Sequence, residues 1–337
     1  MTLTLDKAER RPPDDDWNAP EGGVICAFAF RAGAAAPVEA PDPAPPVDAD
    51  WTWTHLRLGD VRAVAWVRRI EDLPAKALQL FRVEEDRIQI DQAGDWVFGV
   101  LPDFERDLGG EAQGEGRLAF AFDGRRLVTG RLHALLAIDD LRHAAASGEA
   151  LAGPAAAILR LVELYVTRAE DLLEARGTEL ASFEDYVLTA PSSPRERPLT
   201  ELRRAVARQR RELQALRSAL ARATTSRHGR RIERLGENVR DLIAWLEDSD
   251  HAATALQERG RLLHEEIDTL INAATNRSMR VLTVISTLLI PPTLIVGAFG
   301  MNVPGIPWEH SRAGFWIASG LCVVVVAGAF WMLRRLS

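Results

Sequence analysis

The chain has 337 residues, of which 47% are hydrophobic and 26% charged, so it is long enough for a sizeable core and is neither disordered nor fibrous. Its two cysteines, Cys26 and Cys322, are too few for a disulfide framework and indicate a reducing compartment. A net charge of -7 argues against a nucleic acid partner, because phosphate binding needs a basic face. A small secreted scaffold and a nucleic-acid-binding protein are therefore excluded.

Residues 1–50 are rich in proline and are predicted to be a largely flexible leader with one strand, Val24–Phe30. The segment Met1–Asp16 carries basic residues but no apolar run behind them, so we expect no cleavable signal.

Residues 51–153 alternate short β-rich runs with helical stretches, a pattern typical of a cytoplasmic α+β domain with a mixed β-sheet flanked by helices. Strands are predicted at 51–58, 87–91, 96–101, 117–122 and 125–132, and helices at 61–70, 73–81 and 138–146. Only Asp123 and Gly124 separate two of the runs, and this pair is preferred in tight two-residue turns. A β-hairpin is expected there.

Residues 154–278 are predicted to be wholly helical, as a cytoplasmic stalk. Helices are expected at 155–187 and 199–225, followed by a third that starts near Arg230 and continues into an apolar segment. No proline interrupts residues 230–290, which would extend roughly 90 Å if fully helical. A helix that long and mostly polar needs neighbours, so we expect an oligomer.

Charge along the stalk is segregated, with a net +8 over residues 201–240 and a net -6 over residues 241–270. If several copies surround an axis, the acidic block would form a negative vestibule that concentrates cations. The alternative is a solvated helix face with complementary neighbours, and the pattern alone favours neither.

Two uncharged segments near the C-terminus are predicted to be transmembrane helices, 279–299 and 313–333. Their uncharged parts would extend roughly 28 and 31 Å, enough to cross a bilayer core. Arginines flank both segments on one side, whereas the connector 300–312 holds only two formal charges. The positive-inside rule therefore places both termini, including the tail 334–337, in the cytoplasm and makes the connector a periplasmic loop.

The first span carries small and polar residues at helical spacing, which would let one face of it line a pore. The predicted pore-lining residues are Asn276, Met279, Thr283, Ser286, Ile290, Thr293 and Gly297. Packing between helices would explain the hydroxyl groups equally well. Pro291 and Pro292 would free backbone carbonyls near the middle of the span.

The sequence Gly300-Met301-Asn302 at the end of the first span, together with 279–287 and 291–297 before it, resembles the CorA superfamily of divalent cation transporters. The following residues 303–308 are more similar to the ZntB zinc transporter branch, although Pro304 replaces an expected glycine. The resemblance implies a funnel-shaped homopentamer in which the first span lines the pore and the second surrounds it.

Gly300, Met301 and Asn302 are the predicted selectivity motif. A ring of Asn302 amides could bind the hydration waters of an entering ion without removing them. An asparagine helix cap beside a left-handed glycine would account for the same residues.

Metal ligands are also conceivable in the acidic block, where His264 and Asp268 are one helical turn apart. The candidates are Asp241, His264, Glu265 and Asp268. A solvated or salt-bridging role is the commoner one for any such pair. Sequence motifs for ATP-driven pumping or hydrolysis are missing, so we expect no enzyme and no required cofactor.

The predicted function is transport of divalent cations, most of all Zn²⁺, with Mg²⁺, Co²⁺, Ni²⁺ or Cd²⁺ as further cargo, across the bacterial inner membrane. The expected partners are four further copies of the chain and the lipid bilayer. One alternative is a magnesium or cobalt channel of the same superfamily. The other is a membrane-anchored coiled-coil scaffold or sensor, in which the spans only tether the stalk.

Overall fold

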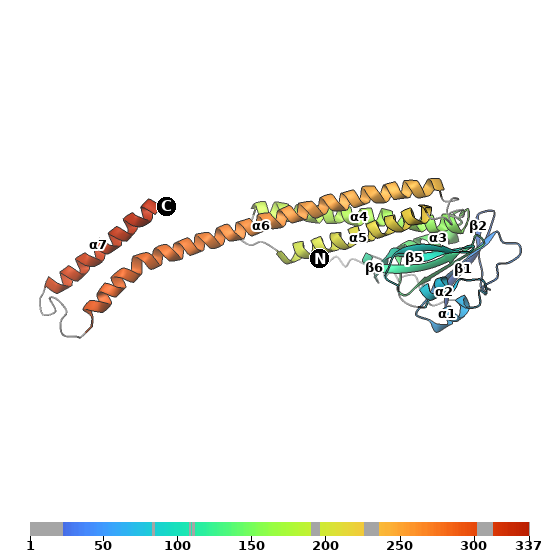
Figure 1. Ribbon diagram of the computed structural model, residues 1–337, viewed down its shortest axis with the longest axis horizontal. Helices are drawn as coiled ribbons and strands as arrows, with labels where there is room; N and C mark the ends of the chain where they lie inside the picture. The colour runs from blue at the N-terminus through green and yellow to red at the C-terminus, as the bar shows by residue number, and fades with distance from the viewer. Residues whose placement is uncertain are drawn as a thin grey trace, which may run out of the picture. The chain divides into compact units, whose positions relative to one another are not determined.

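The computed structural model describes residues 23–82, 85–107, 109, 112–189, 196–225, 236–301 and 313–336 (Figure 1). The chain divides into two compact units. One unit comprises residues 1–182 and 197–260, and the other comprises residues 183–196 and 261–337.

The first unit contains a seven-stranded mixed sheet with the strand order β2-β1-β3-β7-β6-β5-β4. Its strands are β1 (Val24–Arg31), β2 (Ala34–Pro37), β3 (Trp51–Arg57), β4 (Gln89–Ala93), β5 (Trp96–Arg106), β6 (Ala112–Phe122) and β7 (Arg126–Arg131). Only β3 and β7 are parallel. The predicted mixed sheet with flanking helices is thus confirmed, although it starts at Val24 rather than near Trp51.

The predicted hairpin joins β6 and β7, displaced by one residue from the expected turn. Phe122 pairs with Leu127, and the Asp123 N–H donates to the Arg126 carbonyl, so Gly124 and Arg125 form the two-residue loop. Gly124 has a φ of +111°, a conformation that side chains disfavour. The Asp123 carboxylate accepts the N–H groups of Arg125 and Arg126, which explains the aspartate before the turn.

Helices cover both faces of the sheet. On one face, α1 (Val61–Val67) and α2 (Ala75–Leu80) pack their buried side chains, including Trp66 and Leu80, against Phe98 and Val128. On the other face lie α3 (Leu136–Ala146) and the long helices α4 (Pro154–Thr189) and α5 (Glu196–Thr225). Local sequence sets where these helices start: Asp60 caps α1, and Pro154 occupies the first position of α4.

Helix α3 is capped by a residue distant in sequence. Its own N-cap, Leu135, offers no side-chain acceptor, but the buried carboxylate of Asp103 on β5 accepts the N–H groups of Ala137 and Ile138 at 2.9 and 3.1 Å. Burial raises the pKa of Asp103 to about 7, although these hydrogen bonds favour its charged form. The contact fixes α3 to the sheet.

The third long helix, α6 (Gly236–Phe299), has 64 residues and continues without a break through Pro291 and Pro292. Its first part packs beside α4 and α5 in the first unit (Figure 1). Trp245 and Ser249 donate hydrogen bonds to Glu170 of α4, whereas Asp250 accepts them from Arg210 of α5. Neighbouring residues of α6 are thereby tied to two different helices.

Candidate transport site

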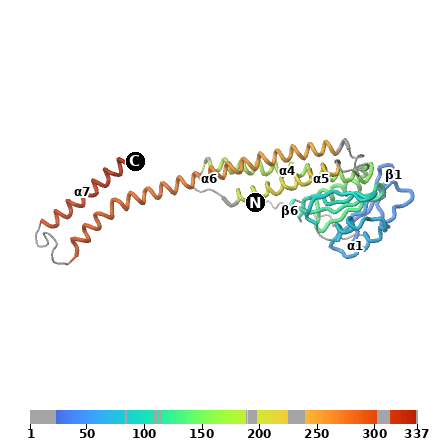
Figure 2. The backbone as a smooth tube through the Cα atoms, viewed as in Figure 1, coloured from blue at the N-terminus to red at the C-terminus, as the bar shows by residue number. Residues whose placement is uncertain are grey.

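Two helices of the second unit are long and apolar enough to cross a membrane: the C-terminal part of α6 and α7 (Ala313–Leu336). They are antiparallel (Figure 2). The Cys322 thiol lies 3.9 Å from the Pro292 carbonyl oxygen, which brings the middle of α7 beside the middle of the α6 span.

One face of the α6 span packs against α7. The half-buried residues that recur at helical spacing on α6 are Val284, Leu288, Pro291, Ile295 and Phe299. On α7 the matching series of buried and half-buried residues is Gly314, Ala318, Cys322, Val325 and Ala329. The small residues at the start of this α7 series let the two backbones approach closely.

The predicted pore-lining residues lie on the other side of α6. At about 100° per residue, their stripe is centred roughly 150° around the helix from the α7-facing residues. All of them are exposed in the single chain except Ser286, which is half-buried. The stripe is therefore available to other copies of the chain or to water.

Two threonines of the stripe satisfy their hydroxyl donors on their own helix. Thr283 donates to the Met279 carbonyl at 2.8 Å, and Thr293 donates to the Leu289 carbonyl at 2.7 Å. Hydroxyl groups within a span commonly donate to a carbonyl of their own helix in this way. This bonding also leaves oxygen lone pairs on the exposed face, where they can accept hydrogen bonds from the waters of a hydrated cation.

A groove of about 520 Å³ runs along the C-terminal half of this face. Its lining residues are Leu289, Ile290, Thr293, Leu294, Gly297, Ala298 and Met301. Four of these residues belong to the predicted site: Ile290, Thr293, Gly297 and Met301. Leu289, Leu294 and Ala298 were not predicted, because apolar residues beside a polar stripe resemble any lipid-facing residue.

The two prolines weaken the helical ladder within the span. Proline has no N–H, so the carbonyls of Thr287 and Leu288 lack their usual hydrogen-bond donors four residues later. Both residues are half-buried. The structure thus places two backbone acceptors near the middle of the span, as predicted.

At the end of α6, Gly300 donates its N–H to the Val296 carbonyl at 2.8 Å, and Met301 donates to Ala298 at 3.4 Å. The alternative considered from the sequence, a helix cap with a left-handed glycine, requires a positive φ at Gly300. The φ of Gly300 does not lie in that region. Met301 is 55% exposed in the single chain and lines the groove. The third residue of the motif, Asn302, lies outside the described residues.

The candidate metal ligands of the acidic block come together only in part. His264 Nε2 lies 3.8 Å from Asp268, but Glu265 pairs with Arg261. Asp241 is exposed six turns earlier on α6. Within the described segments, no three His, Cys, Asp or Glu side chains are grouped closely enough to hold a metal ion.

The charge segregation of the stalk is neutralised in part within the chain. Arg210 pairs with Asp250 at 3.0 Å, and Arg217 pairs with Glu247 at 3.3 Å, so the basic block of α5 meets the acidic block of α6. This geometry favours complementary neighbouring helices for these residues. Asp241 and Asp248 stay exposed on α6.

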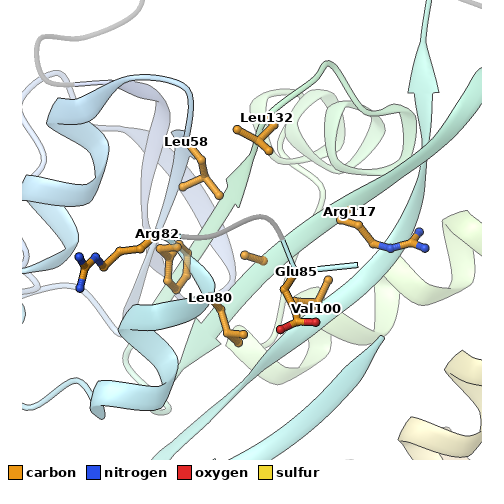
Figure 3. Close-up of a pocket in the computed structure, with 9 residues that line it drawn as sticks. Leu58, Leu80, Arg82, Glu85, Val100, Arg117 and Leu132 are labelled. Atoms are coloured by element: carbon orange, nitrogen blue, oxygen red, sulfur yellow. The ribbon is translucent and has the colours of Figure 1, made fainter. Parts of the chain in front are cut away.

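A further cavity, in the first unit, has a volume of about 60 Å³, which suffices for a few waters (Figure 3). It is mainly apolar, with Arg82, Glu85 and Arg117 among its lining residues. Arg117 also pairs with Glu212 at 3.0 Å. The cavity brings together no set of catalytic groups.

Comparison with known proteins agrees with the arrangement of the spans. A family model described as CorA-like Mg²⁺ transporter protein matches residues 48–335. The divalent cation transporter CmaX of Pseudomonas aeruginosa is 26% identical over 286 residues, which cover 84% of this chain and 86% of CmaX. The zinc transport protein ZntB of Cronobacter sakazakii is 22% identical over 293 residues, with the same coverage.

Solved structures are similar over nearly the whole chain. The full-length CmaX structure has a TM-score of 0.79 and 25% identity, and the match covers 94% of this chain and 99% of CmaX. The CorA magnesium transporter of Methanocaldococcus jannaschii has a TM-score of 0.71 at 18% identity, with coverage of 93% and 98%, and shares the fold. The resemblance noted from the sequence is confirmed: because the family model spans more than four fifths of the chain, the chain belongs to the CorA-like Mg²⁺ transporter family.

Proposed function

We propose that this protein transports divalent cations across the bacterial inner membrane through a homopentameric pore, with both termini in the cytoplasm. The observation that carries the proposal is the position of the polar stripe on the α6 span, which faces away from α7. A membrane tether needs no such stripe, so the arrangement favours a pore over a scaffold or sensor. Transport rather than catalysis is then the activity.

Zn²⁺ is the proposed principal cargo. The relatives named above include zinc transport proteins and a divalent cation transporter, whereas the family description names Mg²⁺. The stripe offers threonine oxygens and no charged ligand, which suits a hydrated ion passing with its waters. Mg²⁺, Co²⁺, Ni²⁺ and Cd²⁺ are the further ions to compare.

The proposed number of five copies comes from the resemblance to the CorA superfamily, and the exposed stripe on α6 supports assembly from several copies. Two spans per chain cannot enclose a pore, so one face of α6 must be contributed by several copies. Asn302 would then stand near the pore entrance as the selectivity residue, and the exposed acids Asp241 and Asp248 would attract cations below the membrane.

Ion flux into proteoliposomes tests the function. Purified protein should admit Zn²⁺ faster than protein-free vesicles do, and parallel assays with Mg²⁺ should give the order of preference. Native mass spectrometry of the same sample should show five copies. Vesicles with inserted protein that admit neither ion at a rate above that of empty vesicles would rule out transport and favour the scaffold.

A further inference from the structure

Four arginines lie at the same end of the two-helix hairpin. Arg277 and Arg280 precede the apolar part of α6, whereas Arg334 and Arg335 follow that of α7. The contact between Pro292 and Cys322 sets the antiparallel register. Twelve residues back from Pro292 and twelve residues on from Cys322 lead to Arg280 and Arg334, which therefore lie at the same depth.

Among the described residues of the second unit, no acidic side chain neutralises these charges. All four side chains are exposed, and they form no ion pair within the described residues. The preceding acid on α6 is Asp268, 9 residues before Arg277 and thus about 14 Å along the helix, and α7 contains no acid. Each chain therefore presents four positive charges at one level.

Two of the arginines are held by aromatic rings. The Arg334 guanidinium lies 5.4 Å from the centre of the Phe330 ring, and that of Arg335 lies 4.3 Å from the Trp331 ring. Aromatic side chains at a span end favour the headgroup level of a bilayer, and arginines extend their charged ends toward the same layer. The groups that arginine meets there are lipid phosphates, which it can bind through two parallel hydrogen bonds.

We propose that Arg277, Arg280, Arg334 and Arg335 form a binding site for the phosphate groups of anionic phospholipids in the cytoplasmic leaflet. The orientation rests on the proposed function, in which this end of the spans faces the cytoplasm. Five copies would otherwise bring twenty positive charges near the path of a departing cation. Bound lipid phosphate lowers that repulsion, so the lipid also supports transport.

Lipid retention tests the site without depending on transport. Full-length protein is equilibrated with mixed micelles of phosphatidylglycerol and phosphatidylcholine, and the lipids that stay bound are counted by native mass spectrometry. Wild-type protein should retain phosphatidylglycerol selectively. The variant with Arg334→Gln and Arg335→Gln should retain it roughly fivefold less for each arginine removed. The matched control, Arg204→Gln on the exposed face of α5, should behave as wild type.

Three outcomes would overturn the proposal. Equal retention by the wild type and the double variant places the lipid elsewhere, and equal retention of both lipids shows that headgroup charge plays no role. If inorganic phosphate stabilises the wild type as strongly as phosphatidylglycerol does, the arginines bind soluble anions instead. Where the double variant does not assemble, Arg277→Gln with Arg280→Gln gives the same comparison. Selective retention in a protein without ion flux would keep the lipid site and reject only the transport function.

Discussion

Single residues bear on the stability of the first unit and on the proposed selectivity. Asp103 is a carboxylate removed from water that still serves as the cap of α3. Asn302 is a neutral amide expected where an ion enters. Asp103 binds backbone N–H groups of its own chain, whereas the proposed role of Asn302 requires it to release the ion that it binds.

Asp103 should make the first unit less stable as pH rises from about 4 to about 7. Its folded pKa of about 7 exceeds the ordinary value of 3.8, so the folded state holds the proton more tightly than the unfolded state does. The stabilisation that the Asp103 carboxyl group contributes is fully present below pH 4 and is lost as pH rises through 7. Asp103→Asn should remove that part of the slope in thermal unfolding between pH 4 and 8, whereas Asp140→Asn, on the helix α3 that Asp103 caps, should leave it. An unchanged slope in Asp103→Asn would contradict the assignment.

Asn302→Ala should lower Zn²⁺ uptake steeply while the pentamer still assembles. The substitution removes the amide acceptors for hydration waters but permits the chain to turn. Asn302→Asp should also slow passage, because a charged ring binds the ion too tightly. Since aspartate caps a helix nearly as well as asparagine, a purely structural cap would tolerate this change. Uptake at the wild-type rate by assembled Asn302→Ala would move selectivity to Thr293 and Gly297.

Elements are predictable from the sequence where their signals are local. The two spans, the long helix into the membrane and the β6–β7 hairpin all follow from composition, proline positions and the Asp123-Gly124 pair. The strands β5 and β6 were predicted too short, because Pro102, Gly114 and Gly116 resemble strand ends. A Cβ on Gly116 would lie 2.3 Å from the Leu135 side chain, so this glycine permits close packing within a continuous strand.

The same reasoning explains what could be predicted of the site. The period of the stripe on α6 follows from the sequence, but which side of the helix α7 covers depends on packing between distant residues. The partners of Asp250 and Glu247 on α5 were likewise not predictable, because charge blocks show complementarity but no register. Pro102 is tolerated within β5 because β4 pairs with β5 only as far as Val100. Beyond Val100 this edge of β5 is open, so the missing N–H of proline breaks no hydrogen bond between β4 and β5.

The Arg210–Asp250 pair should contribute more to helix packing than the Arg217–Glu247 pair. Asp250 is only 12% exposed at its side chain and also accepts hydrogen bonds from Gln214, whereas the Glu247 side chain is 52% exposed. Double-mutant cycles with alanine should give a coupling of about 1–2 kcal/mol for the first pair and about 0–0.5 kcal/mol for the second. The measurement is chemical unfolding in detergent. Equal coupling energies for the two pairs would show that the burial of Asp250 does not strengthen its ion pair with Arg210.

At the scale of the whole molecule, the fold separates two tasks between the two units. The first unit holds its long helices together with polar contacts such as Glu170–Ser249 and Arg210–Asp250. The membrane unit pairs its spans through small and apolar residues and leaves the polar stripe uncovered. The ion pairs of a single chain therefore neutralise its stalk charges only in part, and its polar stripe stays available to other copies in the proposed pentamer.

The glycines of the spans offer a test of which face lines the pore. Gly297 lies on the stripe of α6, and Gly320 lies on the exposed side of α7; an added Cβ meets no atom within 4 Å at either position in the single chain. Leucine should therefore fit at both places within one chain. In the pentamer, five leucines at position 297 would narrow the pore with apolar side chains, so Gly297→Leu should abolish Zn²⁺ flux. Gly320→Leu would face lipid and should retain most of the flux.

Both variants must first be shown to assemble, by native mass spectrometry of the protein used for flux. Assembled Gly297→Leu with wild-type flux would place the pore on another face of α6, whereas loss of flux in both variants would indicate a general effect of bulk in the spans. Gly297→Ala gives a graded control: a single methyl group per chain should reduce flux only partly. A flux that falls in the order Gly, Ala, Leu at position 297, but not at position 320, identifies the stripe as the ion path.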